Sequence, residues 1–516
     1  MTTQNPYHQQ VPPQMGQGMM LSPIPRQQLP RPKMVTGRSL FPDWLSKYAV
    51  ATYLLALVVV SVLYSTYNVP WYFMLAGVVS VVVFFVYGRR QMMEWTETQI
   101  HKSKTYERKI FWLSFWTRLL WTLLIYTIFM RMYGDTFGFE KEDAYFYDQL
   151  GRFVAGLINE GNYHIYDEVS KWSGTDDIAD MGYGIYVGAI YFLTNKNILV
   201  VRLLKCILSS YTVVLMYRLA RREFGESVGR ITAMFCALWP NFWYYCGVHL
   251  KETEMVFLAV LFVEQADQML RSRQFTAWKV APVILLAAIL FTFRTPLAIV
   301  AVLALLFALV MTSSKVVGWG KRIVVGGLAV LLIFTTLGTR IEDNARSLME
   351  SVERSPQNKN LEWRSTRVNG NAFAKYAGAA VFAPLIFTIP FPTMAMPYEG
   401  QKVQMLLNGG NYVKNILSFF TIFALIWLLL CGSWRDHLLP LAFMLGYLVV
   451  LVMSSFPHSE RFHQPVMPFE FMFMVYGLSI VVRRFKYKRW FGYWCVLIFL
   501  ATVVWNWFKL AGRGLV

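Results

Sequence analysis

Long apolar runs alternate with polar, often basic, segments along most of the chain. The first three runs cover about 48–65, 70–87 and 110–130, and each is long enough to cross a hydrocarbon layer of about 30 Å as a helix. Ten later runs have the same character: about 199–219, 228–247, 251–269, 277–294, 295–313, 322–339, 411–431, 437–455, 464–482 and 490–508. The pattern predicts an all-α integral membrane protein with about 13 transmembrane helices.

Two further apolar segments do not fit a simple span. The segment 182–194 is only about 13 residues long, so we expect a half-buried or re-entrant helix. The segment 379–393 is interrupted by three prolines, which disfavours a straight helix. We expect it to dip into the outer leaflet or to roof a cavity, and one kinked extra helix is the alternative. This segment and the stretch SPQNKNLEW are candidate lids.

The basic residues lie on alternate connections between the runs. Lys and Arg concentrate in RLARREFGESVGR, RSRQFTAWK, SSKVVGWGKR, WRDH and RRFKYKRW, whereas the other short connections have almost none. Cytoplasmic loops of membrane proteins carry this excess, so the N-terminus is predicted to lie inside. Two large loops, 134–198 and 340–410, are then extracytoplasmic. The expected location is the cell inner (plasma) membrane, with a periplasmic or otherwise extracytoplasmic active site.

The beginning of the chain differs from the rest. It is rich in Gln, Pro, Met and Gly and has no hydrophobic period, which is typical of disorder. We expect a disordered cytoplasmic tail over 1–45 and a polytopic transmembrane domain over 46–516. No cleavable signal peptide is expected, because the first apolar run starts only near Tyr48.

Composition excludes several classes of protein. Of the 516 residues, 56% are hydrophobic, more than a soluble domain of this length buries. The formal net charge of +19 would suggest nucleic acid in a soluble protein, but here the charge follows the sidedness of the loops, so no nucleic-acid partner is expected. The five cysteines are scattered and form no CxxC pair, which indicates neither a zinc site nor a disulfide framework.

Carboxylates cluster directly after the third apolar run, in FGFEKEDAYFYDQL. Glu140, Glu142, Asp143 and Asp148 fall on the predicted outer face. A carboxylate at the boundary of membrane and water can act as a general base, because low dielectric and neighbouring carboxylates raise its proton affinity. A solvated loop that merely begins with charge is the alternative.

The turn GVHLKETEM lies between two predicted spans. Lys251 and Glu252 are charged in a turn with little room, which indicates either snorkelling ends or a polar pocket. We favour the pocket. His249 is a weaker candidate for a proton carrier or a phosphate donor, since a single His at a helix end is more often structural.

Two outer turns carry isolated arginines, Arg294 in FRTP and Arg461 in SFPHSERFHQP. A guanidinium fork suits phosphate oxygens, and headgroup anchoring is the alternative. His458 and His463 flank Arg461 and strengthen the phosphate interpretation. No cofactor is assigned with certainty. A divalent metal bound by these histidines and Glu460 stays open, although the spacing is not a recognised ligand pattern.

Arg202 and Lys205, in VVRLLKC, are further candidates for phosphate contact, and snorkelling is as good an explanation. In the predicted topology the acidic cluster and all of these cations share the outer face. Anchoring residues alone would favour the opposite side.

Three segments together resemble a known family. They are the acidic pair Glu142–Asp143 followed by a tyrosine and an amphipathic stretch, the run from GYGIYVGAIYFLT to CGVHLKE, and the late ERFHQPVMPFEFMFMVYG. The chain is similar to the GT-C membrane glycosyltransferases, in particular the bacterial group related to protein O-mannosyltransferases and the lipid A aminoarabinose transferase. The likeness is strongest over about 137–266. The chain differs in having two spans before the acidic loop and no large soluble C-terminal domain.

The resemblance implies a GT-C-like bundle with two large extracytoplasmic loops. It implies a sugar donor linked to polyprenyl phosphate, an extracytoplasmic acceptor (glycan, lipid or protein) and an inverting displacement. Asp143 would be the base with Glu142 in reserve, and Glu252 and Arg461 would line the site. Glu140 and Asp148 would have no role. Arg461, Arg294 and Lys251 would hold the phosphate.

Two rival functions remain. A polysaccharide polymerase or O-antigen-ligase-like enzyme also has many spans and outer arginines, but it uses a lipid-pyrophosphate glycan and relies on Arg and His. A transporter or flippase would place paired charges in mid-span. Since we expect the predicted spans to be almost free of such charge, transport is disfavoured.

Overall fold

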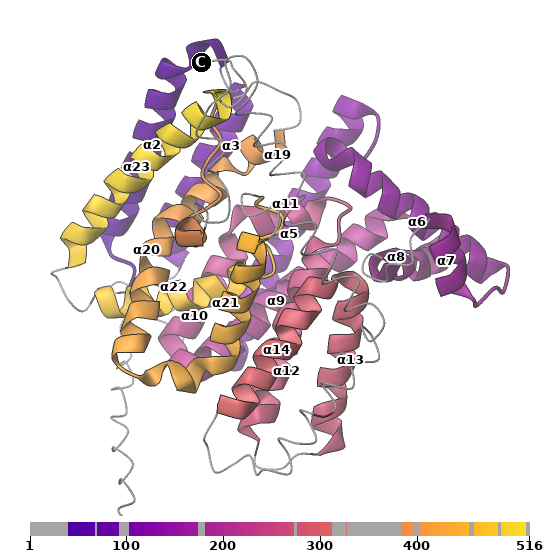
Figure 1. The fold of residues 1–516 in the computed structure, drawn as a ribbon. Coiled ribbons are helices and arrows are strands. Elements are labelled where there is room, and N and C mark those ends of the chain that lie inside the picture. Colours follow the sequence, from indigo (N-terminus) through magenta and orange to yellow (C-terminus); the bar gives the residue numbers. More distant parts are fainter. Residues whose placement is uncertain are drawn as a thin grey trace, which may run out of the picture.

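The computed structural model describes residues 40–67, 70–91, 103–173, 181–272, 276–311, 327, 383–395, 402–453, 459–482 and 487–511. Helices and short connections make up these residues, with no β-strand among them. The helices form one bundle, from which α6, α7 and α8 project on one side (Figure 1). The predicted all-α class is confirmed.

Seven helices in this part of the chain are long and apolar enough to cross a membrane. They are α2 (Asp43–Leu63), α3 (Trp71–Val82, continued by the π-helical turn Val83–Tyr87), α5 (Ser103–Tyr133), α9 (Ile198–Phe224), α20 (Asn408–Leu430), α21 (Leu438–Met453, preceded by the turn Ser433–His437) and α23 (Tyr487–Ala511). The shorter apolar helices are α8 (Met181–Thr194), α13 (Ala277–Phe293), α14 (Thr295–Met311) and α22 (Met467–Val481). The remaining helices are α6 (Lys141–Asn159), α7 (Ile165–Ser173), α10 (Glu226–Leu238), α11 (Pro240–Gly247), α12 (Glu252–Arg271), α19 (Lys402–Leu406) and the 3-10 turns Ser65–Tyr67 and Gly138–Glu140.

Several boundaries differ from those expected. The total of about 13 spans is not confirmed, and the predicted span 322–339 lies outside the described residues, apart from residue 327. The first helix of the bundle begins at Asp43, inside the segment 1–45 expected to be a tail, of which residues 1–39 are not described. The short helix predicted over 182–194 is present as α8.

The predicted span 228–247 is not one helix, because Pro240 divides it into α10 and α11. Proline has no N–H, so the carbonyl of Cys236 loses its helical partner. Arg118, in the middle of α5, supplies the donors: its Nη2 lies 3.0 Å from Cys236 O and its Nη1 lies 3.3 Å from Ala237 O. The buried guanidinium therefore satisfies the end of a helix that terminates inside the bundle.

Buried charges are more frequent in the helices than we expected from the sequence. Besides Arg118, the pairs Lys205–Glu254, at 3.6 Å, and Lys414–Glu470, at 3.8 Å, are almost fully buried. The expectation that the spans carry almost no charge is therefore wrong, and it gives no reason to disfavour a transporter. Lys205–Glu254 joins α9 to α12, and Lys414–Glu470 joins α20 to α22, so each ion pair links two neighbouring helices.

The proline-rich segment is described from residue 383 to 395 and contains no span. Side chains of α20 and α23 satisfy its backbone: Asn415 Nδ2 donates to Pro390 O at 3.0 Å, and Asn506 Oδ1 accepts from the amides of Met394 and Ala395. Non-helical backbone is tolerated at membrane depth when protein groups bind it in this way. The described part of this candidate lid is tied to the bundle, and SPQNKNLEW lies outside the described residues.

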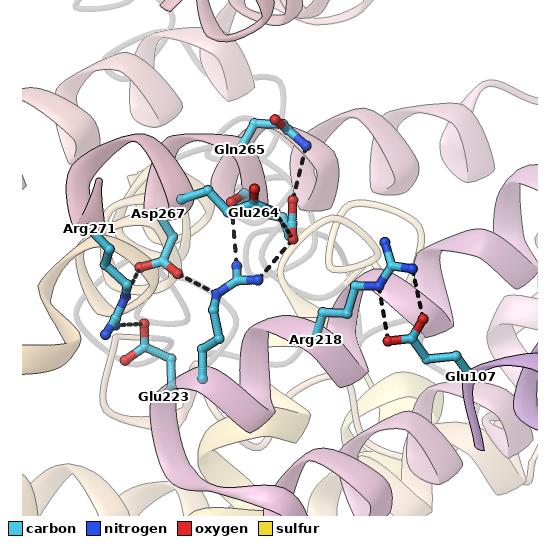
Figure 2. Close-up of polar contacts among 9 residues, drawn as sticks. Glu107, Arg218, Glu223, Glu264, Gln265, Asp267 and Arg271 are labelled. Carbon is cyan, nitrogen blue, oxygen red and sulfur yellow. Dashed lines mark hydrogen bonds and ion pairs between the residues drawn. The ribbon is translucent and has the colours of Figure 1, made fainter. Parts of the chain in front are cut away.

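A group of ion pairs joins the far ends of α9 and α12. Arg222 Nε lies 2.9 Å from Asp267 Oδ2, and Arg271 binds both Asp267, at 2.7 Å, and Glu223, at 2.5 Å. Figure 2 shows the side chains of Arg271, Asp267 and Glu223 turned toward one another. Glu223 also meets His437, at 2.5 Å, so the turn before α21 joins the same group. The ends of three segments are thereby fastened together.

Candidate functional site

The acidic stretch folds as a 3-10 turn, Gly138–Glu140, followed directly by α6. Asp148 is buried in the contact between α6 and α8, where Tyr191 donates to Oδ1 at 2.5 Å and Arg152 donates to Oδ2 at 2.7 Å. A side chain at Gly151 would overlap Val187, so the two helices need glycine to approach this closely. These contacts fix α6 and leave its first turn facing the bundle.

A buried lysine holds the turn between α11 and α12. Lys205, on α9, donates to Val248 O at 2.9 Å and also binds Leu250 O. These bonds fix the backbone just before Lys251 and Glu252. Lys205 was predicted to contact phosphate, but its ammonium is enclosed by this turn and by Glu254.

The turn that precedes α22 carries Arg461 to the start of α6. Its Nη1 contacts Asp143 Oδ2, its Nε contacts Glu252 Oε1, and Glu140 Oε2 lies 3.9 Å from Nη1. Nη2 makes no hydrogen bond to any described residue. Three carboxylates from two distant segments thus surround one guanidinium, and we call Glu140, Asp143, Glu252 and Arg461 the carboxylate–arginine cluster.

Burial sets the electrostatics of this cluster. Burial raises the pKa of Glu140 to about 7, although Arg461 opposes the shift. Burial lowers the pKa of Lys251 to about 7, and the charge of Arg294 adds to the effect. Burial would lower the pKa of Arg461, but Glu252 and Asp143 outweigh it and raise that pKa. Two groups with opposite charge therefore titrate near neutrality beside a permanent cation.

Two further cations lie beside the cluster. Lys251 Nζ donates to Phe293 O at 3.0 Å, and the next residue, Arg294, lies over the ring of Phe462 at 4.1 Å. The guanidinium of Arg294 forms no hydrogen bond or ion pair with the described residues, so its five donors are available to a ligand. Since Phe462 follows Arg461 directly, Arg294 and Arg461 reach the same place from different turns.

Other predicted residues lie elsewhere. Glu142 is exposed and binds no described residue. Arg202 is fully buried and donates to Thr136 O at 2.5 Å, so it fastens the start of the acidic stretch. His463 is buried with Nδ1 2.8 Å from Lys414 Nζ, away from solvent.

His249 is fully buried beneath the turn. Its ring is parallel to that of Tyr191 and also near Tyr183, and neither ring nitrogen has a hydrogen-bond partner among the described residues. Burial holds its pKa well below the usual value, so it stays neutral. His458 is not described, and no group of three or more His, Cys, Asp or Glu side chains in the described chain could hold a metal ion.

Glu140 is the residue of this cluster that we passed over in the sequence. It was set aside with Asp148, yet it lies near Arg461 and is mostly buried. Its spacing of three residues from Asp143 was a usable signal, because side chains three apart share a face where the chain is helical. Asp148, in contrast, has only the structural contacts given above.

One protein family matches part of the chain. Residues 185–338 fit the family model of the dolichyl-phosphate-mannose-protein mannosyltransferases. The match includes α8 to α14, with Lys251, Glu252 and Arg294, and it excludes Asp143 and Arg461. No curated protein and no solved structure matches the chain.

This match falls on the middle of the three segments that carry the resemblance noted in the sequence. It supports a membrane glycosyltransferase of the GT-C type and, with the apolar helices, a multi-pass membrane protein. The likeness of this chain to the GT-C glycosyltransferases of the dolichyl-phosphate-mannose-protein mannosyltransferase group is therefore confirmed over residues 185–338.

Proposed function

We propose that the chain transfers a sugar from a polyprenyl-phosphate-linked donor to an extracytoplasmic acceptor. The observation that carries this proposal is the contact of Arg461 with both Asp143 and Glu252, beside Arg294 and Lys251. Such a transfer needs a base for the acceptor proton and cations for the departing phosphate. Here one of the cations also holds the base. The family match adds support, since its members are named for a lipid-phosphate sugar donor.

In this mechanism Asp143 takes the proton of the acceptor hydroxyl or amine. The acceptor atom attacks the anomeric carbon, and the bond from that carbon to the phosphate oxygen breaks on the opposite face, which inverts the configuration. Arg294, Lys251 and the unused Nη2 of Arg461 neutralise the departing lipid phosphate. Asp143 is about half exposed, so an acceptor can reach it from outside the bundle.

The roles of Arg461 and Glu252 follow from their contacts. Two of the donor groups of Arg461 are occupied by carboxylates, so its main task is to position Asp143 rather than to bind phosphate. Glu252 holds the guanidinium from the opposite side. Arg461 is thus the cation that positions the base, whereas Arg294 and Lys251 are the cations that bind the phosphate.

The test is Asp143→Asn in the full-length protein in proteoliposomes, with polyprenyl-phosphate mannose as the donor and a cell-envelope extract as the acceptor. The amide cannot accept the proton, so release of polyprenyl phosphate should fall by roughly 100-fold or more, with donor binding retained. The matched control is Asp167→Asn, which changes an exposed carboxylate on α7 of the same loop. Undiminished transfer by Asp143→Asn would show that Asp143 is not the base.

A further inference from the structure

A narrow pocket continues from Glu252 into the bundle. Its lining includes Tyr245, Glu252 and Gln464, and also Arg118 and Cys236. Its walls come from α5, α9, α10, α11 and α12 and from the turn that carries Arg461. Glu252 thus belongs both to the carboxylate–arginine cluster and to the lining of this pocket.

Three polar atoms of the residues around this pocket have no partner among the described residues. They are the hydroxyl of Tyr245, Oε2 of Glu252 and Oε1 of Gln464, and all three side chains are at most 1% exposed. The amide orientation of Gln464 is set by its Nε2, which donates to Glu460 O at 2.9 Å. Buried polar groups left without a partner are costly, so three of them beside one pocket indicate a bound group.

The donors and acceptors define the chemistry of that group. The phenol supplies one donor, whereas the carboxylate oxygen and the amide oxygen are both acceptors. A water molecule accepts one hydrogen bond and donates two, which satisfies all three atoms at once. A substrate hydroxyl has only one hydrogen to donate, and an anion has none, so both would leave an acceptor unsatisfied.

Arg118, which also lines the pocket, has hydrogen-bond partners of its own. Arg118 already donates to Ser209 Oγ at 2.7 Å and to the carbonyls of Cys236 and Ala237. Among the lining residues, the unsatisfied polar atoms are therefore those of Tyr245, Glu252 and Gln464. Buried waters in proteins typically make about three hydrogen bonds to groups of this kind.

We propose that one ordered water binds between Tyr245, Glu252 and Gln464 and that it fixes the carboxylate that holds Arg461. Glu252 then has Oε1 on the guanidinium and Oε2 on the water. Tyr245 and Gln464 are positioning residues that act through Glu252 and Arg461 on Asp143. The water site is inferred from the contacts alone, whereas its expected effect on catalysis depends on the proposed sugar transfer.

The first test is an experimental structure of the full-length protein at a resolution that shows ordered waters. Density for one water is expected in contact with all three side chains, and it should disappear in Tyr245→Phe. Tyr244→Phe is the matched control, because Tyr244 is the neighbouring buried phenol, also has an unpartnered hydroxyl and does not line the pocket. An empty pocket, or a direct hydrogen bond from Tyr245 to Glu252, would overturn the proposal.

The second test measures kinetics with polyprenyl-phosphate mannose. Tyr245→Phe should lower kcat by about fivefold to tenfold, the effect of one lost hydrogen bond, with KM for the donor unchanged. Tyr244→Phe should keep both constants. Equal kcat in the two variants would overturn the positioning role. If the wild-type protein transfers no sugar, the proposed function fails, and the density still decides the water site.

Discussion

Arg461 and Asp143, 318 positions apart in the sequence, form an ion pair at the start of α6. The same guanidinium binds Glu252, so a single side chain joins the acidic stretch, the turn before α12 and the turn before α22. A planar fork with several donors can serve two carboxylates in this way, whereas an ammonium cannot hold both in fixed directions. The position of the Asp143 carboxylate therefore depends on the shape of Arg461 as well as on its charge.

Arg461→Lys should separate shape from charge. The ammonium keeps the positive charge but cannot hold Asp143 and Glu252 together, so the base moves from its place. We expect kcat for release of polyprenyl phosphate to fall by about 100-fold, the effect of a small misplacement of a catalytic group. Arg435→Lys is the control, since Arg435 lies over Trp434 in the turn before α21, outside the cluster. Equal loss in both variants would point to a general defect.

Glu140→Gln tests the carboxylate that sequence reasoning set aside. Its pKa is raised to about 7 by burial, so Glu140 gains its negative charge as pH rises through about 7. The charged Glu140 adds a third carboxylate to the guanidinium that holds Asp143, which fixes that guanidinium more firmly, and kcat of the wild-type protein should therefore rise over the same interval. The rise should be absent in Glu140→Gln and retained in Glu160→Gln, an exposed change at the end of α6. A rise retained in Glu140→Gln would exclude this role, and Glu142→Gln would then test the reserve candidate.

Lys251→Arg tests the phosphate site through KM. The pKa of Lys251 is lowered to about 7 by burial and by Arg294, so the ammonium loses its charge as pH rises through about 7. A donor phosphodiester stays anionic throughout, and KM should therefore increase above pH 7 in the wild-type protein. Arginine keeps its charge, so in Lys251→Arg the KM should stay nearly constant across the interval. A parallel increase in KM in both proteins would place the titrating group elsewhere.

Arg118→Met tests the support of the helix that ends inside the bundle. The carbonyl of Cys236 would lose its donor, and we expect a loss of stability of about 1–3 kcal/mol. Pro240→Ala restores an N–H that can bind this carbonyl, so it should cost less in the Arg118→Met background than alone. Thermal unfolding midpoints of the four proteins give the coupling. Arg131→Met, an exposed change on the same helix, should have little effect, and additive effects would show that the two sites are independent.

Local pattern was sufficient to predict much of the helical framework. The helices α8, α13 and α21 begin and end within two residues of their predicted limits, because apolar runs between charged or proline-containing turns define such boundaries. The break at Pro240 was also readable, since proline inside an apolar run interrupts a helix. We predicted a single span because the whole run, 228–247, is long enough to cross a membrane.

The contacts of the site depended on information that local pattern lacks. The resemblance, together with the shared outer face, pointed to Asp143, Glu252 and Arg461, and the structure brings these three together. Glu140 and Glu142 lie on different sides of one turn. Which of these sides faces Arg461 is decided by how α6 packs against α8. In the sequence, Lys205 and His463 resemble surface cations. Only their contacts with Leu250 and Lys414, which are distant in the sequence, show that they lie inside the bundle and hold its segments together.

The ion pairs among Arg222, Arg271, Glu223 and Asp267 indicate from which side the bundle can be entered. They lie at the ends of α9 and α12 opposite to Arg202 and Glu252, and both carboxylates in them are almost fully buried. Opening that end would require separating these charges, which would leave two almost fully buried carboxylates without their partners, and an unpaired buried charge is costly. Alternating access needs both ends to open in turn, whereas a transferase needs one. We therefore expect any opening of the bundle at the end beside the carboxylate–arginine cluster, rather than at the end closed by these ion pairs.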